Sequence, residues 1–223
     1  MNYGNRDQNG KKWEDYDYIT CMDGQVIDMN KLLDDQQRAK AALVHIQPFF
    51  GAFINKLKPI YTFRVATQAT DGVHLFINPQ FTYNMDLTEK VFVLAHEIMH
   101  CVLNHLRRAR NLGHDPKRSN VAADYECNIT IAQMDLIKVA TMKKLGALVD
   151  EKFANMGYET IYDKVGSQSS KDSMDNSDGE NGGSSSGNGG NSSGSGSQKE
   201  YSQDYKDGWK QAIEDYKNGK LKL

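Results

Sequence analysis

Two histidines and a glutamate in the middle of the chain have the types and the spacing of a metal site. His96 and His100 are four residues apart, and Glu97 follows the first of them in the segment HEIMH. On a helix, residues i and i+4 lie on one face, one turn apart, so both imidazoles can reach one ion. Zinc accepts imidazole nitrogens and lowers the pKa of a coordinated water towards about 7. The pattern predicts zinc held by His96 and His100, with Glu97 as general base.

A catalytic zinc ion usually has a third protein ligand, and two further histidines are candidates. His105 lies nine residues after His96, about 180° round a continuous helix. It could act as a ligand only if the helix broke directly after His100, and the three residues that follow His100 contain no glycine or proline. His114 lies in an expected loop and remains possible.

Asp124 is the third candidate and the one that we favour. It is an ionisable residue in a helical segment of small and apolar residues, and the adjacent Ala122 and Ala123 would let that helix approach another closely. Asn128 lies four residues further on, on the same face, and could orient a metal ligand. The alternative is that Asp124 only pairs with an arginine of the cluster at 107–110.

The hydrophobic pattern predicts an α+β domain with a small antiparallel β-hairpin. A helix is expected over 31–57, interrupted by Pro48, and strands over 61–67 and 73–77, joined by an Asp-Gly turn. A capping box formed by Asp86 and Glu89 should begin a helix over 87–110. Further helices are expected from 119 or 120 to about 136 and over 158–165. For Asp124 to meet His100, the 112–119 loop must run back, or the 87–110 helix must end early.

Composition divides the chain into four parts. Residues 1–30 are polar and are expected to form a flexible N-terminal arm, and residues 31–165 to form the globular domain. About two-thirds of the residues from 166 to 197 are Gly or Ser, which predicts a disordered linker over 166–198 with a span of roughly 30 Å. Residues 199–223 should form a short amphipathic helix whose aromatic stripe, within 201–216, could dock on a protein partner.

Charge and hydropathy exclude several classes of function. The net charge is −2, so nothing in the composition favours binding to nucleic acid or to an anionic membrane. The sequence contains no run of 18 apolar residues, so no transmembrane helix is predicted. The three cysteines are odd in number and widely spaced, as in a reduced, cytoplasmic protein, and Cys101 and Cys127 are expected to be core thiols.

Several ordered segments together resemble a known family. They comprise ATDG at 69–72, NPQF at 78–81, LAHEIMH at 94–100, AADYECN at 122–128, and LVD at 148–150 followed by Phe153, Met156 and ETIY at 159–162. Their order and spacing resemble the putative metallopeptidase domain of tailed phages, also found in bacteria upstream of a von Willebrand A-type domain. The resemblance covers about residues 35–165 and implies a zincin-like core with zinc held by the two histidines and an aspartate. The absence of a von Willebrand A domain resembles the phage form, which would place the protein in the host cytoplasm.

Two functions compete at this point. The first is a zinc-dependent peptidase that hydrolyses an unidentified protein. In zincins a strand before the active-site helix binds the substrate backbone, and residues 73–77 occupy that place, so His74 and Phe76 should flank the cleft. The alternative is a non-catalytic zinc-binding module that recruits a partner through its C-terminal helix. Glu97 favours the enzyme, because a structural zinc site has no use for an unliganded carboxylate beside the metal.

Overall fold

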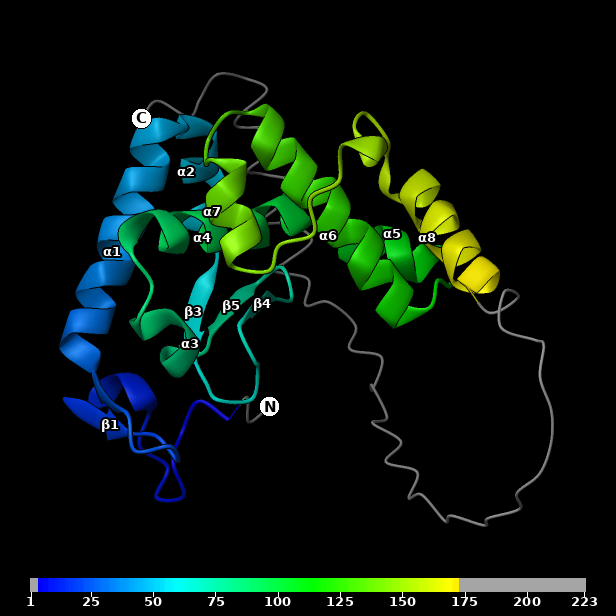
Figure 1. Ribbon diagram of the computed structural model, residues 1–223. Coiled ribbons are helices and arrows are strands. Elements are labelled where there is room, and N and C mark those ends of the chain that lie inside the picture. The colour runs from blue at the N-terminus through cyan, green and yellow to red at the C-terminus, as the bar shows by residue number, and fades with distance from the viewer. Residues whose placement is uncertain (1–3, 173–223) are drawn as a thin grey trace, which may run out of the picture.

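The computed structural model describes residues 4–172, and of these the side chains of residues 4–166. They form a mixed α+β fold in which helices surround a small sheet (Figure 1). The helices are α1 (Met29–Ile46), α2 (Gly51–Ile54), α3 (Pro79–Tyr83), α4 (Leu87–Val102), α5 (His105–Asn111), α6 (Pro116–Gln133), α7 (Val139–Lys144) and α8 (Tyr158–Asp172). The strands are β1 (Tyr18–Thr20), β2 (Val26–Asp28), β3 (Lys58–Tyr61), β4 (Gln68–Thr70) and β5 (His74–Ile77).

The N-terminal segment is an ordered hairpin and not the loose arm that its polar composition predicts. Strands β1 and β2 pair antiparallel, with Ile19 opposite Ile27. Both isoleucines are buried in the main core together with Met29 at the start of α1. Because the alternation runs over only three residues in each strand, it is too short to stand out in a sequence rich in polar residues.

The first long helix confirms the expected interruption at Pro48. Helix α1 begins after Asp28, whose side chain accepts a hydrogen bond from the Lys31 amide, and it ends at Ile46. A short 3₁₀ turn, Pro48–Phe50, then leads into α2. Proline has no amide hydrogen to continue the helical ladder, so the chain changes direction there.

The second sheet is three-stranded and mixed, in the order β3-β5-β4. The Asp71-Gly72 turn joins β4 to β5 in an antiparallel hairpin as expected, with Gly72 at φ 86°. The expected strand over 61–67 is wrong, because β3 ends at Tyr61 and pairs parallel to β5. The Asn78 side chain donates to the carbonyls of Val65 and Ala66, so side-chain contacts replace a strand ladder in that loop.

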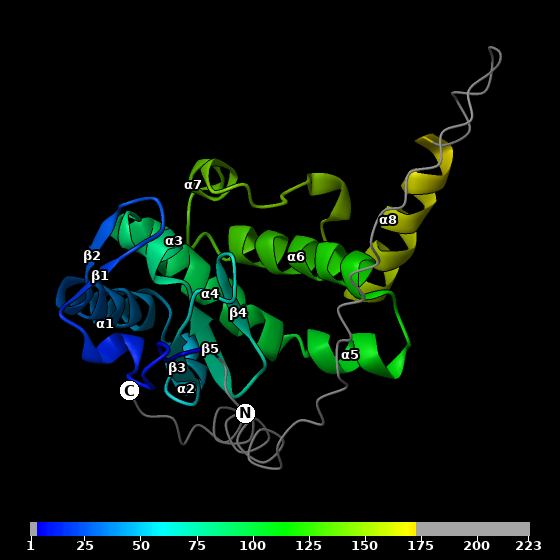
Figure 2. The same cartoon turned by 90° about the horizontal axis from the view of Figure 1, so that it is seen from below.

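Helix α4 lies at the centre of the molecule. It contacts α1, β4 and α6, and it lies between the sheet and α6 in Figure 2. The expected capping box is present: the Asp86 carboxylate accepts from the Glu89 amide, and the Glu89 carboxylate accepts from the Asp86 amide. This reciprocal pair fixes where the helix begins and hence which side chains face each neighbour.

The helix expected over 87–110 breaks at Asn104. Helix α4 ends at Val102, Asn104 adopts a left-handed conformation with φ 57°, and α5 begins at His105. Asparagine tolerates this region better than other non-glycine residues, which allows a sharp turn without glycine or proline. Because α4 ends early, Asp124 lies opposite His100. The break also places His105 beside His100, whereas a continuous helix would turn the two side chains apart.

A second, smaller core holds α6 against α8. Ala122 and Ala123 on α6 pack with Phe153, Tyr158 and Ile161. The two alanines therefore do allow a close helix approach, and the partner helix is α8. The opposite face of α6 remains free to meet α4.

None of the helices within residues 4–172 is both long and apolar enough to cross a membrane. The expected Gly/Ser linker lies outside the described residues except for its start, since α8 extends to Asp172. The expected helix over 199–223 lies outside them entirely, so docking of a partner on residues 201–216 stays a prediction.

The break at Asn104 gives a test of backbone strain. Asn104→Gly should leave the free energy of unfolding within about 0.5 kcal/mol of wild type, whereas Asn104→Ala should lower it by about 1 kcal/mol relative to the glycine variant. Urea denaturation measures the difference. Asn84→Ala and Asn84→Gly are the matched control pair, because Asn84 ends α3 with a φ of −86°, where alanine should be at least as stable as glycine. Equal stability of the two Asn104 variants would contradict the strained turn.

Candidate metal centre and active site

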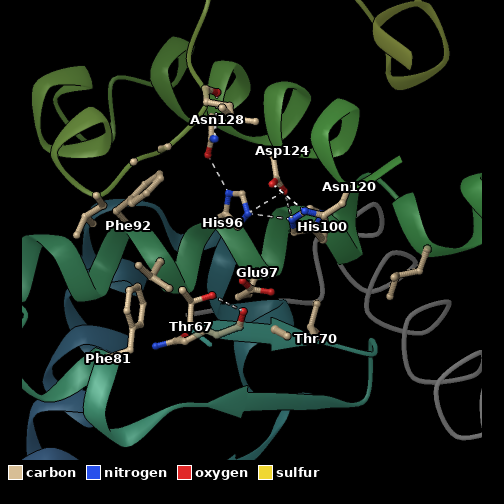
Figure 3. A pocket seen from close by; sticks show the side chains of 18 residues that line it. Thr67, Thr70, Phe81, Phe92, His96, Glu97, His100, Asn120, Asp124 and Asn128 are labelled. Carbon is tan, nitrogen blue, oxygen red and sulfur yellow. Dashed lines mark hydrogen bonds and ion pairs between the residues drawn. The ribbon is translucent and has the colours of Figure 1, made fainter. Parts of the chain in front are cut away.

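Two helices contribute the polar side chains of one cavity. Helix α4 supplies His96, Glu97 and His100, and α6 supplies Asn120 and Asp124, together with Asn128 one turn further on. The residues of α6 follow at intervals of four, so they share one face, which lies opposite the two histidines (Figure 3). The spacing within each helix therefore builds one half of the site.

Three electron-rich atoms converge between the helices. The Nε2 atoms of His96 and His100 are 2.9 Å apart, and the Oδ1 atom of Asp124 lies 3.4 Å from the first and 3.2 Å from the second. In a tetrahedral zinc site with bonds of about 2.0–2.1 Å, neighbouring ligand atoms are about 3.3 Å apart. The triangle formed by the three atoms matches the size of that coordination shell.

The other nitrogen of His96 is fixed by Asn128. His96 Nδ1 lies 2.8 Å from Asn128 Oδ1, and the Asn128 amide nitrogen donates to the Leu148 carbonyl at 3.1 Å. That second bond determines which end of the amide faces His96. Since the amide oxygen can only accept, His96 donates from Nδ1, and neutral His96 presents a lone pair at Nε2.

This donor set fits a divalent cation. Burial lowers the pKa of His100 to about 4 despite its hydrogen bond to Asp124, so His100 is neutral at pH 7. Burial works against charge on Asp124, but the hydrogen bonds to His100 and His96 outweigh it and lower the pKa of the carboxyl group. Burial also opposes charge on His96, whose pKa is nevertheless raised, first by Asp124. The cluster thus calls for one positive charge between its members, which a proton or a metal ion can supply.

Asp124 faces the histidines and not the arginine cluster. Its second oxygen, Oδ2, accepts from the Asn120 amide at 3.0 Å, which turns Oδ1 towards the imidazoles. Arg108, an arginine of the cluster at 107–110, is paired with Glu126 and Glu159 and not with Asp124.

The two histidines considered as third ligands lie away from the converging atoms. His105 contacts His100 on its opposite nitrogen, with 3.1 Å between the two Nδ1 atoms. Burial lowers the pKa of His105 and outweighs the opposing effect of Glu126. His114 hydrogen-bonds to the Tyr158 hydroxyl at 3.0 Å and stacks on Tyr162 in the second core.

Cys127 is an alternative third ligand by distance alone. Its Sγ lies within 4.8 Å of a nitrogen of His96 and of a nitrogen of His100. However, Cys127 is completely buried, and its Sγ contacts His105 Nδ1 at 3.6 Å, on the side of His100 away from Asp124. Burial raises the pKa of its thiol well above the usual range, so the thiol is protonated when no cation is bound.

Glu97 lines the same cavity, which has a volume of about 340 Å³. Its side chain points towards β4, whereas the two histidines point towards α6 (Figure 3). No side chain within the described part of the chain donates a hydrogen bond to its carboxylate. Burial raises the pKa of Glu97 to about 7, against the opposing effect of His96. A carboxyl group with this pKa can both accept and release a proton near neutral pH.

The strand beside the cavity is β4, not the segment 73–77 expected from sequence order. Strand β5 lies in the middle of the sheet, paired with β3 on one side and β4 on the other, so it has no free edge. His74 and Phe76, on β5, are not among the residues that line the cavity, and His74 hydrogen-bonds to Asp71. The lining includes Gln68, Ala69 and Thr70 of the edge strand instead.

Two residues of the site escape the sequence analysis. Asn120 could have been found by extending the interval of four back from Asp124 to the preceding turn. Glu126 gives no such signal, because its contact with His105 depends on the break at Asn104.

Residues 32–221 match the family described as a putative metallopeptidase domain. The chain belongs to this family. The match includes the histidines, Glu97 and Asp124, and it confirms the resemblance carried by the ordered segments. A member of this family is expected to hold a metal ion, and the convergent donor atoms fit that expectation. No curated protein and no solved structure matches the chain.

The raised pKa of Glu97 predicts how the metal-free protein responds to pH. The pKa of Glu97 is about 7 in the folded state and 4.5 in an ordinary environment. With respect to this group, the folded state of wild type is therefore most stable below pH 4.5, and it loses that stability as pH rises through 7. Glu97→Gln cannot ionise. Its melting temperature, relative to wild type, should therefore rise between pH 4 and pH 8 by at least about 2–4 °C, the equivalent of 1 kcal/mol.

Calorimetry of chelator-treated protein provides the measurement. Glu151→Gln, at an exposed position outside the cavity, is the matched control and should show a constant difference from wild type. If the difference in melting temperature between Glu97→Gln and wild type did not change with pH, the pKa of the buried Glu97 carboxyl group would not be raised.

Proposed function

We propose that the chain is a zinc-dependent peptidase that hydrolyses peptide bonds of a protein substrate. The observation that carries this proposal is the convergence of His96 Nε2, His100 Nε2 and Asp124 Oδ1. Beside them lies the buried carboxylate of Glu97, which hydrogen-bonds to none of the three. A metal site with a purely structural role has no need of Glu97. Membership of the metallopeptidase family supports the same conclusion.

The donor set favours zinc among the common metals. Two imidazole nitrogens and one carboxylate oxygen are typical zinc ligands, and three protein ligands leave one position open for water or substrate. A bound zinc ion would supply Lewis-acid activation of that water and of the scissile carbonyl. His96, His100 and Asp124 would hold the ion, and Asn128 would orient His96.

Glu97 would move the proton. In peptide hydrolysis the attacking water must lose a proton, and the leaving amine must gain one. The Glu97 carboxylate faces the cavity, where it could accept the first proton and donate it afterwards. The same side chain would thus act as general base and then as general acid.

Strand β4 would align the substrate. It forms one wall of the cavity and lies at the edge of the sheet, where an extended peptide can add as a further strand. Phe81, Phe92 and Leu145 also line the cavity and offer apolar surface to a side chain of the substrate. We therefore assign the substrate-binding role predicted for His74 and Phe76 to strand β4.

Zinc content distinguishes Asp124 from Cys127 as the third ligand. Wild type should bind one zinc ion per chain, and His96→Ala, His100→Ala and Asp124→Ala should each lose stoichiometric binding. Cys127→Ala should retain it, because its thiol lies behind His100. Mass spectrometry of the native protein and elemental analysis measure the metal. If Cys127→Ala lost zinc and Asp124→Ala kept it, the ligand set would be two histidines and a cysteine.

Glu97→Gln tests catalysis separately from metal binding. The amide keeps the size of the side chain but cannot accept the proton, so zinc should remain while hydrolysis of casein falls by at least about 100-fold. Glu151→Gln serves as the surface control and should be as active as wild type. Equal digestion by Glu97→Gln and wild type, in preparations free of other proteases, would remove Glu97 from the mechanism.

A further inference from the structure

His105 and Glu126 form a buried pair directly behind His100. Only 3% of His105 is exposed, and its Nε2 lies 2.6 Å from Glu126 Oε2. Its Nδ1 lies 3.1 Å from Nδ1 of His100. The chain of contacts therefore runs from a carboxylate through one imidazole to another, and ends at the nitrogen of His100 that faces Asp124.

The chemistry of the carboxylate fixes the direction of these hydrogen bonds. Ionised Glu126 can only accept, so His105 donates to it from Nε2. A neutral His105 then has a lone pair at Nδ1, which accepts a hydrogen bond from His100 Nδ1. His100, with its proton held at Nδ1, presents a lone pair at Nε2 on the side of the proposed ion.

We propose that His105 and Glu126 are positioning residues that hold His100 in its metal-binding tautomer and orientation. This inference rests on the proposed function, because it assigns a role towards the zinc ion. The two ligands of α4 would then be oriented by different groups, His96 by the amide of Asn128 and His100 by an imidazole backed by a carboxylate.

The surroundings of Glu126 keep the pair in place. Arg108 donates to Glu126 Oε2 at 3.1 Å, and it also donates to the Leu103 carbonyl at the end of α4. Glu159, at the start of α8, holds Arg108 from the other side through two hydrogen bonds. The pair is thereby tied to α4, α5, α6 and α8, so its orientation relative to His100 is determined by the packing of four helices.

A histidine that served only the core would stabilise the fold without affecting the metal. The two roles differ in what each needs at position 105. A core role needs only bulk, whereas positioning of His100 needs one acceptor facing Nδ1 of His100 and one donor facing Glu126. Glutamine offers both in a single amide group, and leucine offers neither. The pair of substitutions therefore separates the roles.

The test is the zinc affinity of the full-length protein, measured by competition with a chromogenic chelator. His105→Leu should bind zinc about 10–100-fold more weakly than wild type, because the partner of a ligating histidine is lost. His105→Gln should remain within a few-fold of wild type. His114→Leu is the matched control, since His114 is also held by a hydrogen bond but lies in the second core, and its affinity should be unchanged.

The tautomers can be read in wild type itself, so the proposal does not depend on a variant that folds. Nitrogen NMR of the zinc-loaded protein should show His105 protonated at Nε2 only and His100 protonated at Nδ1. A proton at Nδ1 of His105, or wild-type affinity in His105→Leu, would overturn the proposal, as would loss of stoichiometry at saturating zinc in that variant, which would make His105 a ligand. Wild type that binds no zinc would instead overturn the proposed function, together with this inference.

Discussion

The constraint on which the rest of the structure depends is the close approach of three electron-rich atoms. His96 Nε2, His100 Nε2 and Asp124 Oδ1 lie within 3.4 Å of one another, and their lone pairs would repel without a positive charge between them. Flexible side chains would simply turn apart. They stay together because each is held from behind: His96 by Asn128, His100 by His105, and Asp124 by Asn120. These three hydrogen bonds hold the atoms in a geometry that is favourable only with a positive charge between them.

Helix α6 can meet α4 with a polar face because its other face is apolar and well packed. Ala122, Ala123 and Ile129 belong to the second core with residues of α8, whereas Asp124 and Asn128 face the cavity. This division explains why α6 carries so many small and polar residues in the middle of a domain. The second core also holds the Arg108–Glu159 pair in position, so the packing of α8 bears on the candidate metal centre without touching it.

The sequence predicted those features that depend on local spacing. The four-residue interval of His96 and His100, the capping box at Asp86 and the Asp71-Gly72 turn each depend on neighbours in the chain, and the structure has all three. Features that depend on tertiary contacts were missed. The turn at Asn104 contains neither glycine nor proline, and the order β3-β5-β4 depends on a parallel pair that no periodicity encodes. Both errors changed the site, since the first concealed the contact of His105 with His100 and the second moved the open edge from β5 to β4.

The position of Glu97 follows from the geometry of a single helix between two partners. Successive residues of a helix are rotated by about 100°, so the residue after His96 cannot face the same neighbour as His96. Because α4 lies between α6 and the sheet, that rotation turns Glu97 away from α6, which carries Asp124, and towards β4 (Figure 3). A peptide added along β4 would therefore lie beside Glu97, the proposed proton acceptor, and Asp124, the proposed ligand of α6, would lie on the other side of α4. In the proposed mechanism, the one-residue offset between His96 and Glu97 would separate metal binding from proton transfer, because the strand and α6 contact the helix on different faces.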